Sequence, residues 1–222
     1  VKELTPEPVR FVVNTHYHGD HTGGNENLGE AGALVVAHDN VRRRLAAGTF
    51  MKAFNRQVEP APEGALPVVT FSDAVSFHWN GEEIRVFFVG PAHTDGDSIV
   101  HFVKADVFHM GDTLFNGMYP FIDVSAGGRI DGMIAAADRV LKVADEDTRI
   151  IAGHGPVATK ADLQANRDML AEVRDRIAKL KAEGKSAEQI AAAKPTADLD
   201  EKWGGGFMKP DIWVGLVIES MK

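Results

Sequence analysis

The chain has 222 residues, 44% of them hydrophobic and 25% charged, which is the composition of a globular protein with its own core. It has no apolar run of about 18 residues, and its formal net charge is −8, so we expect neither a membrane span nor nucleic-acid binding. The lack of cysteine excludes disulfides and thiolate ligands and suits either the periplasm or the cytoplasm. We expect a single domain over residues 1–222, with C-terminal helices from about residue 160.

The first predicted element is a buried strand over residues 9–13, and a segment rich in ligand-type side chains follows it. In extended backbone, alternate residues point the same way, so His16 and His18 can converge on one point. Gly19 then permits a sharp turn, after which Asp20 and His21 can face a second point close by. Imidazole and carboxylate groups suit Zn²⁺, so this segment predicts metal binding rather than a run of solvated histidines before a helix.

The next elements are expected to be short. They are a helix over residues 23–29, a strand over 33–37, and a helix over 39–47 with Asp39 as its N-cap. Residues 48–67 are rich in Pro, Gly and Ala, which favours a long loop and a partial helix over the site. Phe50, Met51 and Phe54 in this loop could contact a substrate or pack back on the domain.

Residues 68–110 predict about five strands. Between residues 90 and 156, three turns that contain glycine each follow the end of a predicted strand. His93 follows the strand over residues 84–89, Asp112 follows a short strand over 107–110, and His154 lies between two glycines after a third strand. A His or Asp in such a turn lies at the rim of a sheet, so these three residues are further candidate metal ligands.

The remaining elements are predicted to be helical. They cover residues 130–144, 159–181, 186–192 and 210–221. Trp213 in the last helix is expected to lie in the core.

These motifs together resemble the metallo-β-lactamase superfamily, in order and in approximate spacing, from residue 10 to about 160. The resemblance implies an α/β fold, the four-layered α/β/β/α sandwich, with a two-metal site at the sheet edges. Because only about fourteen residues precede the first motif, we expect N-terminal strands of the first sheet to be missing or replaced by an intermolecular contact. The implied ligands are His16, His18 and His93 for the first metal, Asp20, His21 and His154 for the second, and Asp112 as the bridge.

The implied activity is that of a dinuclear zinc hydrolase in which a metal-bound hydroxide opens an amide bond, with β-lactam hydrolysis as the first hypothesis. Asp20 would act in catalysis by orienting the hydroxide. The alternatives are a glyoxalase II-type thioester hydrolase, an iron-dependent sulfur dioxygenase, and a metal-binding module without turnover. Two zinc ions are the expected cofactors, with iron or manganese as alternatives, and the partner is a small-molecule substrate. The oligomeric state is left open.

The resemblance also bears on substrate. Lactamases of one subclass have a Cys ligand where this chain has Asp112, and a substrate-binding Lys three residues later, where this chain has Phe115. Arg129 or Lys52 could take the place of that Lys.

Residues beyond the ligand set have weaker signals. Asp97 and Thr94 are candidates for fixing the tautomer of a ligand histidine, although a surface turn explains them equally well. The other four histidines are not expected to bind metal, and one of them, His109, could support the site from outside; they are His38, His78, His101 and His109.

Overall fold

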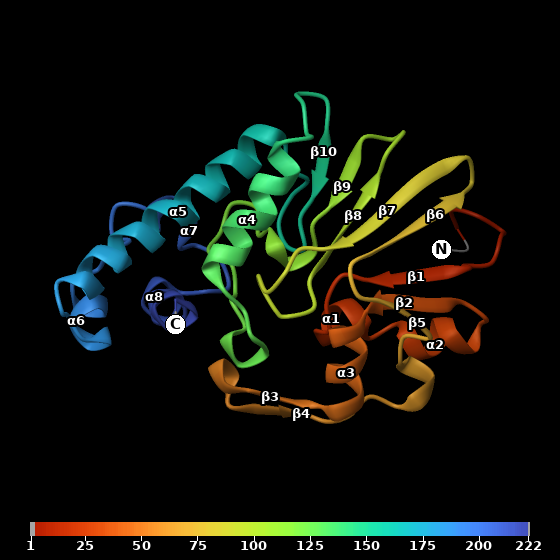
Figure 1. The fold of residues 1–222 in the computed structure, drawn as a ribbon, viewed down its shortest axis with the longest axis horizontal. Helices are drawn as coiled ribbons and strands as arrows, with labels where there is room; N and C mark the ends of the chain where they lie inside the picture. The colour runs from red at the N-terminus through yellow and green to blue at the C-terminus, as the bar shows by residue number, and fades with distance from the viewer. Residues whose placement is uncertain (1–2, 222) are drawn as a thin grey trace.

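The structure, a computed structural model, describes residues 3–221 and contains two main β-sheets (Figure 1). The first sheet is parallel, with its strands in the order β1-β2-β5. Its strands are β1 (Phe11–Asn14), β2 (Leu34–His38) and β5 (Val69–Phe71).

The second sheet has five strands in the order β10-β9-β8-β7-β6. Neighbouring strands are antiparallel from β6 to β9, whereas β10 runs parallel to β9. Its strands are β6 (Ala74–Trp79), β7 (Glu82–Phe88), β8 (Ser98–Phe102), β9 (Val107–His109) and β10 (Arg149–Ile151). The prediction of five strands between residues 68 and 110 is therefore confirmed, since β5 to β9 all lie there.

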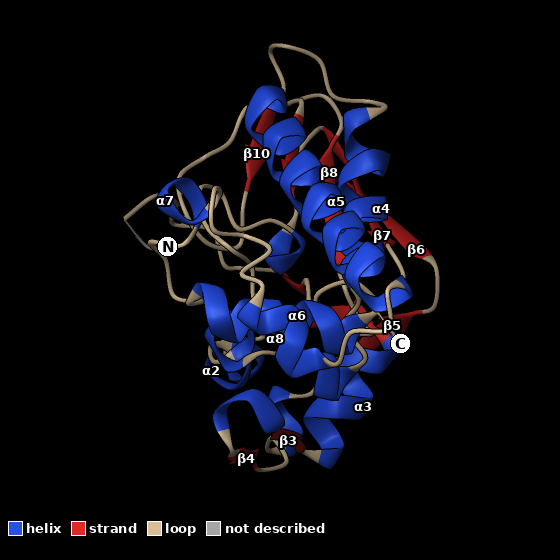
Figure 2. Cartoon of the chain, turned by 90° about the vertical axis from the view of Figure 1, so that its left-hand side faces the viewer, coloured by secondary structure: helices blue, strands red, loops and turns tan. Residues whose placement is uncertain are grey.

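Three apolar layers hold the sheets and helices together. Val36 and Phe71 of the first sheet pack with Val86 and Val100 of the second. Helix α3 (Asp39–Ala47) covers the outer side of the first sheet. Helices α4 (Ile130–Leu141) and α5 (Lys160–Ala182) lie side by side over the outer side of the second sheet (Figures 1 and 2). The predicted α/β/β/α order is confirmed.

The other helices are short or C-terminal. They are α1 (Gly19–Thr22), α2 (Asn25–Glu30), α6 (Ala187–Ala192), α7 (Asp200–Trp203) and α8 (Pro210–Ser220). Trp213 of α8 is fully buried, as predicted, and stacks on Tyr119 with ring centroids 4.1 Å apart. None of the described helices is both long and apolar enough to cross a bilayer.

Several details of the chain differ from the sequence-based prediction. The first strand is mostly half-buried rather than buried, and the short helices α1 and α7 were not expected. Residues 48–67 form an antiparallel hairpin, β3 (Thr49–Met51) and β4 (Arg56–Val58), rather than a partial helix, with only short 3₁₀ turns around it. The N-cap of α3 is His38, whose Nδ1 accepts a hydrogen bond from the Asn40 amide, and not Asp39.

The first sheet is smaller than the second, and β1 forms one of its two edges. Beside β1 a cavity of about 810 Å³ opens between the sheets, and Phe11, Val13, Phe77 and Phe102 are among its lining residues. Within residues 3–221, apolar side chains of both sheets are therefore accessible on this side.

Candidate metal centre

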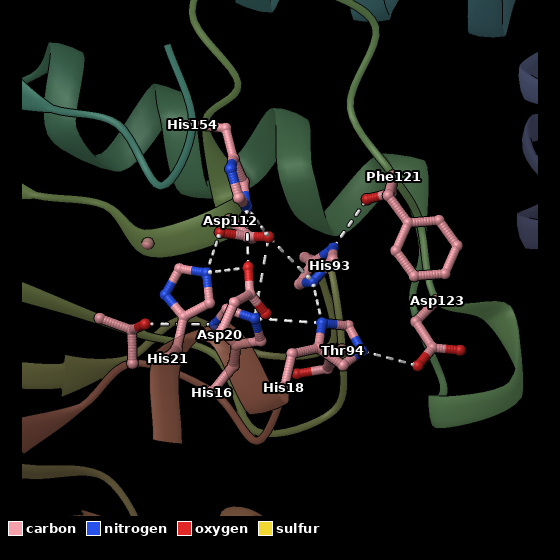
Figure 3. A network of polar contacts seen from close by, with 12 residues as sticks. His16, His18, Asp20, His21, His93, Thr94, Asp112, Phe121, Asp123 and His154 are labelled. Carbon is pink, nitrogen blue, oxygen red and sulfur yellow. Dashed lines mark hydrogen bonds and ion pairs between the residues drawn. The ribbon is translucent and has the colours of Figure 1, made fainter. Parts of the chain in front are cut away.

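Four segments distant in sequence meet where the two sheets adjoin, and they bring all seven predicted ligand side chains together (Figure 3). The first motif follows β1, and the Thr15 carbonyl accepts a hydrogen bond from the Ser98 amide of β8, 2.9 Å away, which joins the two sheets at this point. Asp112 and His154 follow the parallel strands β9 and β10, so they emerge at the same sheet edge.

The first group of side chains is buried. It consists of His16, His18, His93 and Asp112. Each of these side chains offers one ligand-type atom, and the four atoms all lie within 4.8 Å of one another. The Nδ1 atom of His18 lies 3.1 Å from Nε2 of His16 and 2.9 Å from Nε2 of His93. Three imidazoles thus present ring nitrogens to one point.

The second group adjoins the first and is more open. It consists of Asp20, His21 and His154. The Oδ2 atom of Asp20 lies 3.2 Å from Nε2 of His21 and 3.3 Å from Nε2 of His154. Asp112 faces this group as well, because its Oδ1 is 3.1 Å from His21 Nε2 and its Oδ2 is 3.4 Å from His154 Nε2. One carboxylate therefore reaches both groups.

The protonation state of two histidines in the buried first group suits a cation. Burial, followed by the neighbouring His93 and His18, holds the pKa of His16 well below its usual value. Burial also lowers the pKa of His93 to about 4. Both rings are therefore neutral at pH 7 and have a lone pair to offer.

Two buried atoms of the site lack a hydrogen-bond partner. They are His21 Nε2 and Asp112 Oδ1, whose 3.1 Å approach does not have the geometry of a hydrogen bond. Buried polar atoms without a partner are costly, and a divalent cation between them would satisfy both. The donor set of imidazole and carboxylate is one that zinc and iron accept, so the residues present fit a metal ion.

Hydrogen bonds from outside the cluster select which ring nitrogen faces inward. His93 Nδ1 donates to the Phe121 carbonyl at 2.7 Å, which leaves its Nε2 free to bind a metal. His16 Nδ1 lies 3.2 Å from the Thr15 hydroxyl, and its Nε2 likewise points into the cluster. Such partners fix the tautomer and the orientation of a ligand histidine.

Asp123 fixes the third ring, and it was not identified from the sequence. Its Oδ2 accepts a hydrogen bond from His18 Nε2 at 3.1 Å and from the Tyr17 hydroxyl at 2.5 Å. Its Oδ1 accepts one from the Ser125 hydroxyl at 2.6 Å and one from the Ala126 amide at 3.2 Å. Burial raises the pKa of Asp123, but the donors outweigh burial and hold that pKa below its usual range. Asp123 is therefore an ionised acceptor behind His18.

The prediction that Asp97 or Thr94 fixes the tautomer of a ligand histidine is wrong. Asp97 accepts hydrogen bonds from the amide and the hydroxyl of Thr94, at 2.7 and 2.6 Å, and so shapes the loop that carries His93. The ring of His93 is held instead by the Phe121 carbonyl.

The four histidines that were not expected to bind metal lie outside both groups among the described residues. His109 accepts a hydrogen bond from the Gly111 amide at 3.1 Å and so closes the turn before Asp112. This contact agrees with the expectation that His109 supports the site from outside.

Gly153 allows the strand end of β10 to pass close to Asp112. A Cβ atom at this position would lie 2.0 Å from Asp112 Oδ1 and 2.7 Å from the Gly111 carbonyl carbon. No side chain fits there, so a glycine is required before His154 for Asp112 to occupy its place in the site.

A cavity of about 1020 Å³ opens beside the second group. Asp20 and His154 line this cavity, and so do residues of the hairpin β3–β4, as was expected of a segment over the site. His18, Asp112 and Arg56 also line it, and the other lining side chains are apolar: Met51, Phe54, Val58, Phe115, Met118, Phe121 and Phe207.

Lys52 and Arg129, either of which could have taken the place of the lactamase Lys, do not line this cavity. Lys52 forms an ion pair with Glu219 at 2.8 Å, and Arg129 precedes α4. Phe115, at the position of that Lys, stacks on His154 with ring centroids 4.9 Å apart. Arg56, which the sequence did not single out, is the basic residue that lines the cavity.

Comparison with known proteins decides the family. Residues 1–155 match the family model described as the metallo-beta-lactamase superfamily. The chain belongs to this superfamily. Among solved structures, a metallo-beta-lactamase from Pontibacter korlensis is similar, with a TM-score of 0.64 and 20% sequence identity, over 77% of this chain and 73% of that chain. This likeness shows the superfamily fold.

Relatives within the superfamily include several hydroxyacylglutathione hydrolases. The protein of that name from Gloeobacter violaceus is 34% identical over 108 residues, which are 48% of this chain and 35% of that protein. Its counterpart from Rhodospirillum rubrum is 26% identical over 91% of this chain and 70% of that protein. Three of the curated relatives are matched over only 35%, 31% and 52% of their own length.

Proposed function

We propose that this protein is a metal-dependent hydrolase that holds two divalent ions and cleaves thioesters. The observation that carries the proposal is the pair of adjoining donor groups that share Asp112 beside a cavity. His16, His18 and His93 would hold one ion, Asp20, His21 and His154 the other, and Asp112 both. Zinc suits these ligands, and iron or manganese are the alternatives.

Bound ions would polarise the scissile carbonyl and activate water at neutral pH. The chain's own contribution is to orient the reactants. The Asp20 side chain is 57% exposed and lines the cavity, so its carboxylate can accept a hydrogen bond from the attacking water. Overall, the acyl carbon gains the oxygen of water, its bond to sulfur breaks, and the products are a carboxylic acid and a thiol.

A thioester is favoured over the β-lactam of the first hypothesis for two reasons. The relatives that match this chain in sequence include hydroxyacylglutathione hydrolases. The lactamase from Pontibacter, at 20% identity, supports the fold alone. The cavity also has Phe115 where lactamases of one subclass have a substrate-binding Lys. β-Lactam hydrolysis is therefore the second candidate.

The test is a substrate screen on protein whose metals have been quantified. Hydroxyacylglutathione and simple acyl thioesters would be followed by release of thiol, and a chromogenic cephalosporin by its colour change. We expect thioester turnover that chelation abolishes and metal restores. Hydrolysis of the cephalosporin with no thioester turnover would contradict the proposal.

A ligand variant provides the matched comparison. His154→Ala should lower kcat/KM for the thioester by about 100-fold or more, because metal polarisation is worth several kcal/mol and each 1.4 kcal/mol is a factor of ten. His78→Ala removes a histidine from the exposed part of β6, outside both donor groups, and should leave turnover unchanged. Equal activity of the two variants would reject His154 as a ligand.

A further inference from the structure

The cavity beside the donor groups has an aromatic rim built from three distant segments. The ring of Phe54 lies 5.0 Å from that of Phe121 and 5.7 Å from that of Phe207, centroid to centroid. Phe121 is buried, but Phe54 is 40% exposed and Phe207 is 61% exposed. Clustered aromatic rings that remain exposed at the mouth of a cavity are typical of a surface that binds an apolar ligand.

The pleat of the hairpin decides which of its side chains face the cavity. Met51 pairs with Arg56 across the two strands, and successive residues of a strand point to opposite faces. Met51, Arg56 and Val58 therefore share one face and line the cavity, whereas Phe50 is on the other face and does not.

The hairpin is attached to the body of the protein at its tip. Lys52 Nζ forms an ion pair with Glu219 of α8 at 2.8 Å, and the Lys52 amide donates to the Ser125 hydroxyl at 3.3 Å. The rim is thus formed before a ligand arrives, so that less ordering is required on binding.

Arg56 gives this apolar rim a single positive charge. It is exposed, it lines the cavity, and it forms no ion pair or side-chain hydrogen bond with any other residue in the described part of the chain. The chain as a whole has a net charge of −8, and at least five of its eleven other arginines form ion pairs with carboxylates, whereas the guanidinium of Arg56 faces the cavity.

We propose that this cavity selects thioesters with an aromatic acyl group and one carboxylate. The aromatic group would pack against Phe54 and Phe207, and Arg56 would bind the carboxylate with the fork of its guanidinium. This inference rests on the proposed thioester chemistry. A hydroxyacylglutathione has a small polar acyl group and a thiol with several charges, and it would match the apolar rim less well.

The test is a matrix of four thioesters that share one scissile bond. The acyl group is acetyl or phenylacetyl, and the thiol is 2-mercaptoethanol, which is neutral, or 3-mercaptopropionate, which carries a carboxylate. For the wild-type enzyme, kcat/KM should be highest for the phenylacetyl ester of 3-mercaptopropionate, above all three others and above hydroxyacylglutathione.

Two variants separate the two contacts. Arg56→Gln should lower kcat/KM about tenfold for the anionic thiol and leave the neutral one unchanged, as expected for loss of a charged hydrogen bond. Phe54→Ala should lower it about tenfold for phenylacetyl esters and little for acetyl esters, as expected for loss of apolar contact. Arg149→Gln and Phe50→Ala, at exposed positions outside the cavity lining, are the matched controls.

A second measurement separates this inference from the proposed function. Calorimetry would measure binding of the thioether analogue of the favoured substrate, which cannot be hydrolysed. Suppose that no thioester is cleaved, but that the analogue binds and Arg56→Gln lowers its affinity about tenfold. The proposed function would then be wrong, and the proposed selectivity of the cavity would still hold. Similar kcat/KM values for all four esters, or equal binding by wild type and Arg56→Gln, would overturn the inference.

Discussion

At the scale of single residues, the orientation of His18 shows how the centre is prepared for metal. His18 turns Nδ1 toward the other imidazoles and donates its Nε2 hydrogen to Asp123, which three further donors keep ionised. The ring is thereby held in the tautomer whose lone pair faces the cluster.

Asp123→Asn should weaken metal binding at the first site about 10- to 100-fold while the fold is retained. If the Asn oxygen faces Ser125 and Ala126, its amide nitrogen meets His18 Nε2, and this favours the wrong tautomer of the ring. The measurement is metal retained in competition with a chelator. Ser125→Ala, which removes only one of the donors to Asp123, should have a smaller effect, and unchanged affinity in Asp123→Asn would refute the role of this carboxylate.

Gly153→Ala should abolish metal binding at Asp112. The new Cβ would lie 2.0 Å from Asp112 Oδ1, so either the carboxylate or the backbone of Gly111 must move. Gly205→Ala is the control, because a Cβ there meets no atom within 4 Å. Metal content measured by mass spectrometry would decide, and a full complement in Gly153→Ala would contradict the close approach.

The seven side chains that meet in the centre could be named from the sequence because each stands in a short motif at a strand end. Asp123 could not, since it lies 105 positions from His18 and has no neighbouring ligand-type residue. Its role depends on tertiary contacts alone, as does that of the Phe121 carbonyl.

At the scale of elements, strong local signals predict the structure correctly and weak local signals do not. Helix α5 begins where expected, because Thr159 and Asp162 form a capping box. The hairpin β3–β4 was missed because each strand has three residues, too few for alternation to be recognised, and its turn uses Asn55 in the left-handed region. This hairpin lines the cavity, so the incorrect prediction concerns residues that could contact a substrate. The prediction of the metal ligands does not depend on it.

An ion pair that joins α5 to the turn between α6 and α7 should make stability depend on pH. Both terminal nitrogens of Arg176 bind Asp198, at 2.6 and 2.7 Å, and this lowers the pKa of Asp198 to about 2. In the unfolded chain an Asp titrates near pH 4, so the stabilisation is complete above about pH 4 and is lost as the pH falls toward 2.

Asp198→Asn should therefore lower the urea midpoint of unfolding at pH 7, and its difference from wild type should shrink near pH 2. The effect should be modest, because the pair is exposed to solvent. Equal differences at both pH values would show that Asp198 acts through packing and not through charge.

At the scale of the whole molecule, the site lies where two sheets of different design adjoin. The parallel first sheet supplies the His16–His21 segment, and the second sheet supplies His93, Asp112 and His154 at its strand ends. The family resemblance predicted this four-layered arrangement. It could not place the hairpin against α8, since the contact between Lys52 and Glu219 joins residues 167 positions apart.

Metal stoichiometry tests the central claim most directly. The wild-type protein, stripped with a chelator, reloaded with zinc and desalted, would be analysed by inductively coupled plasma mass spectrometry and by native mass spectrometry. Two adjoining donor groups predict two ions per chain, with one or fewer retained in His93→Ala and in His154→Ala, and two in His78→Ala. A folded wild-type protein that retains no metal, or that loses none in either ligand variant, would contradict the account.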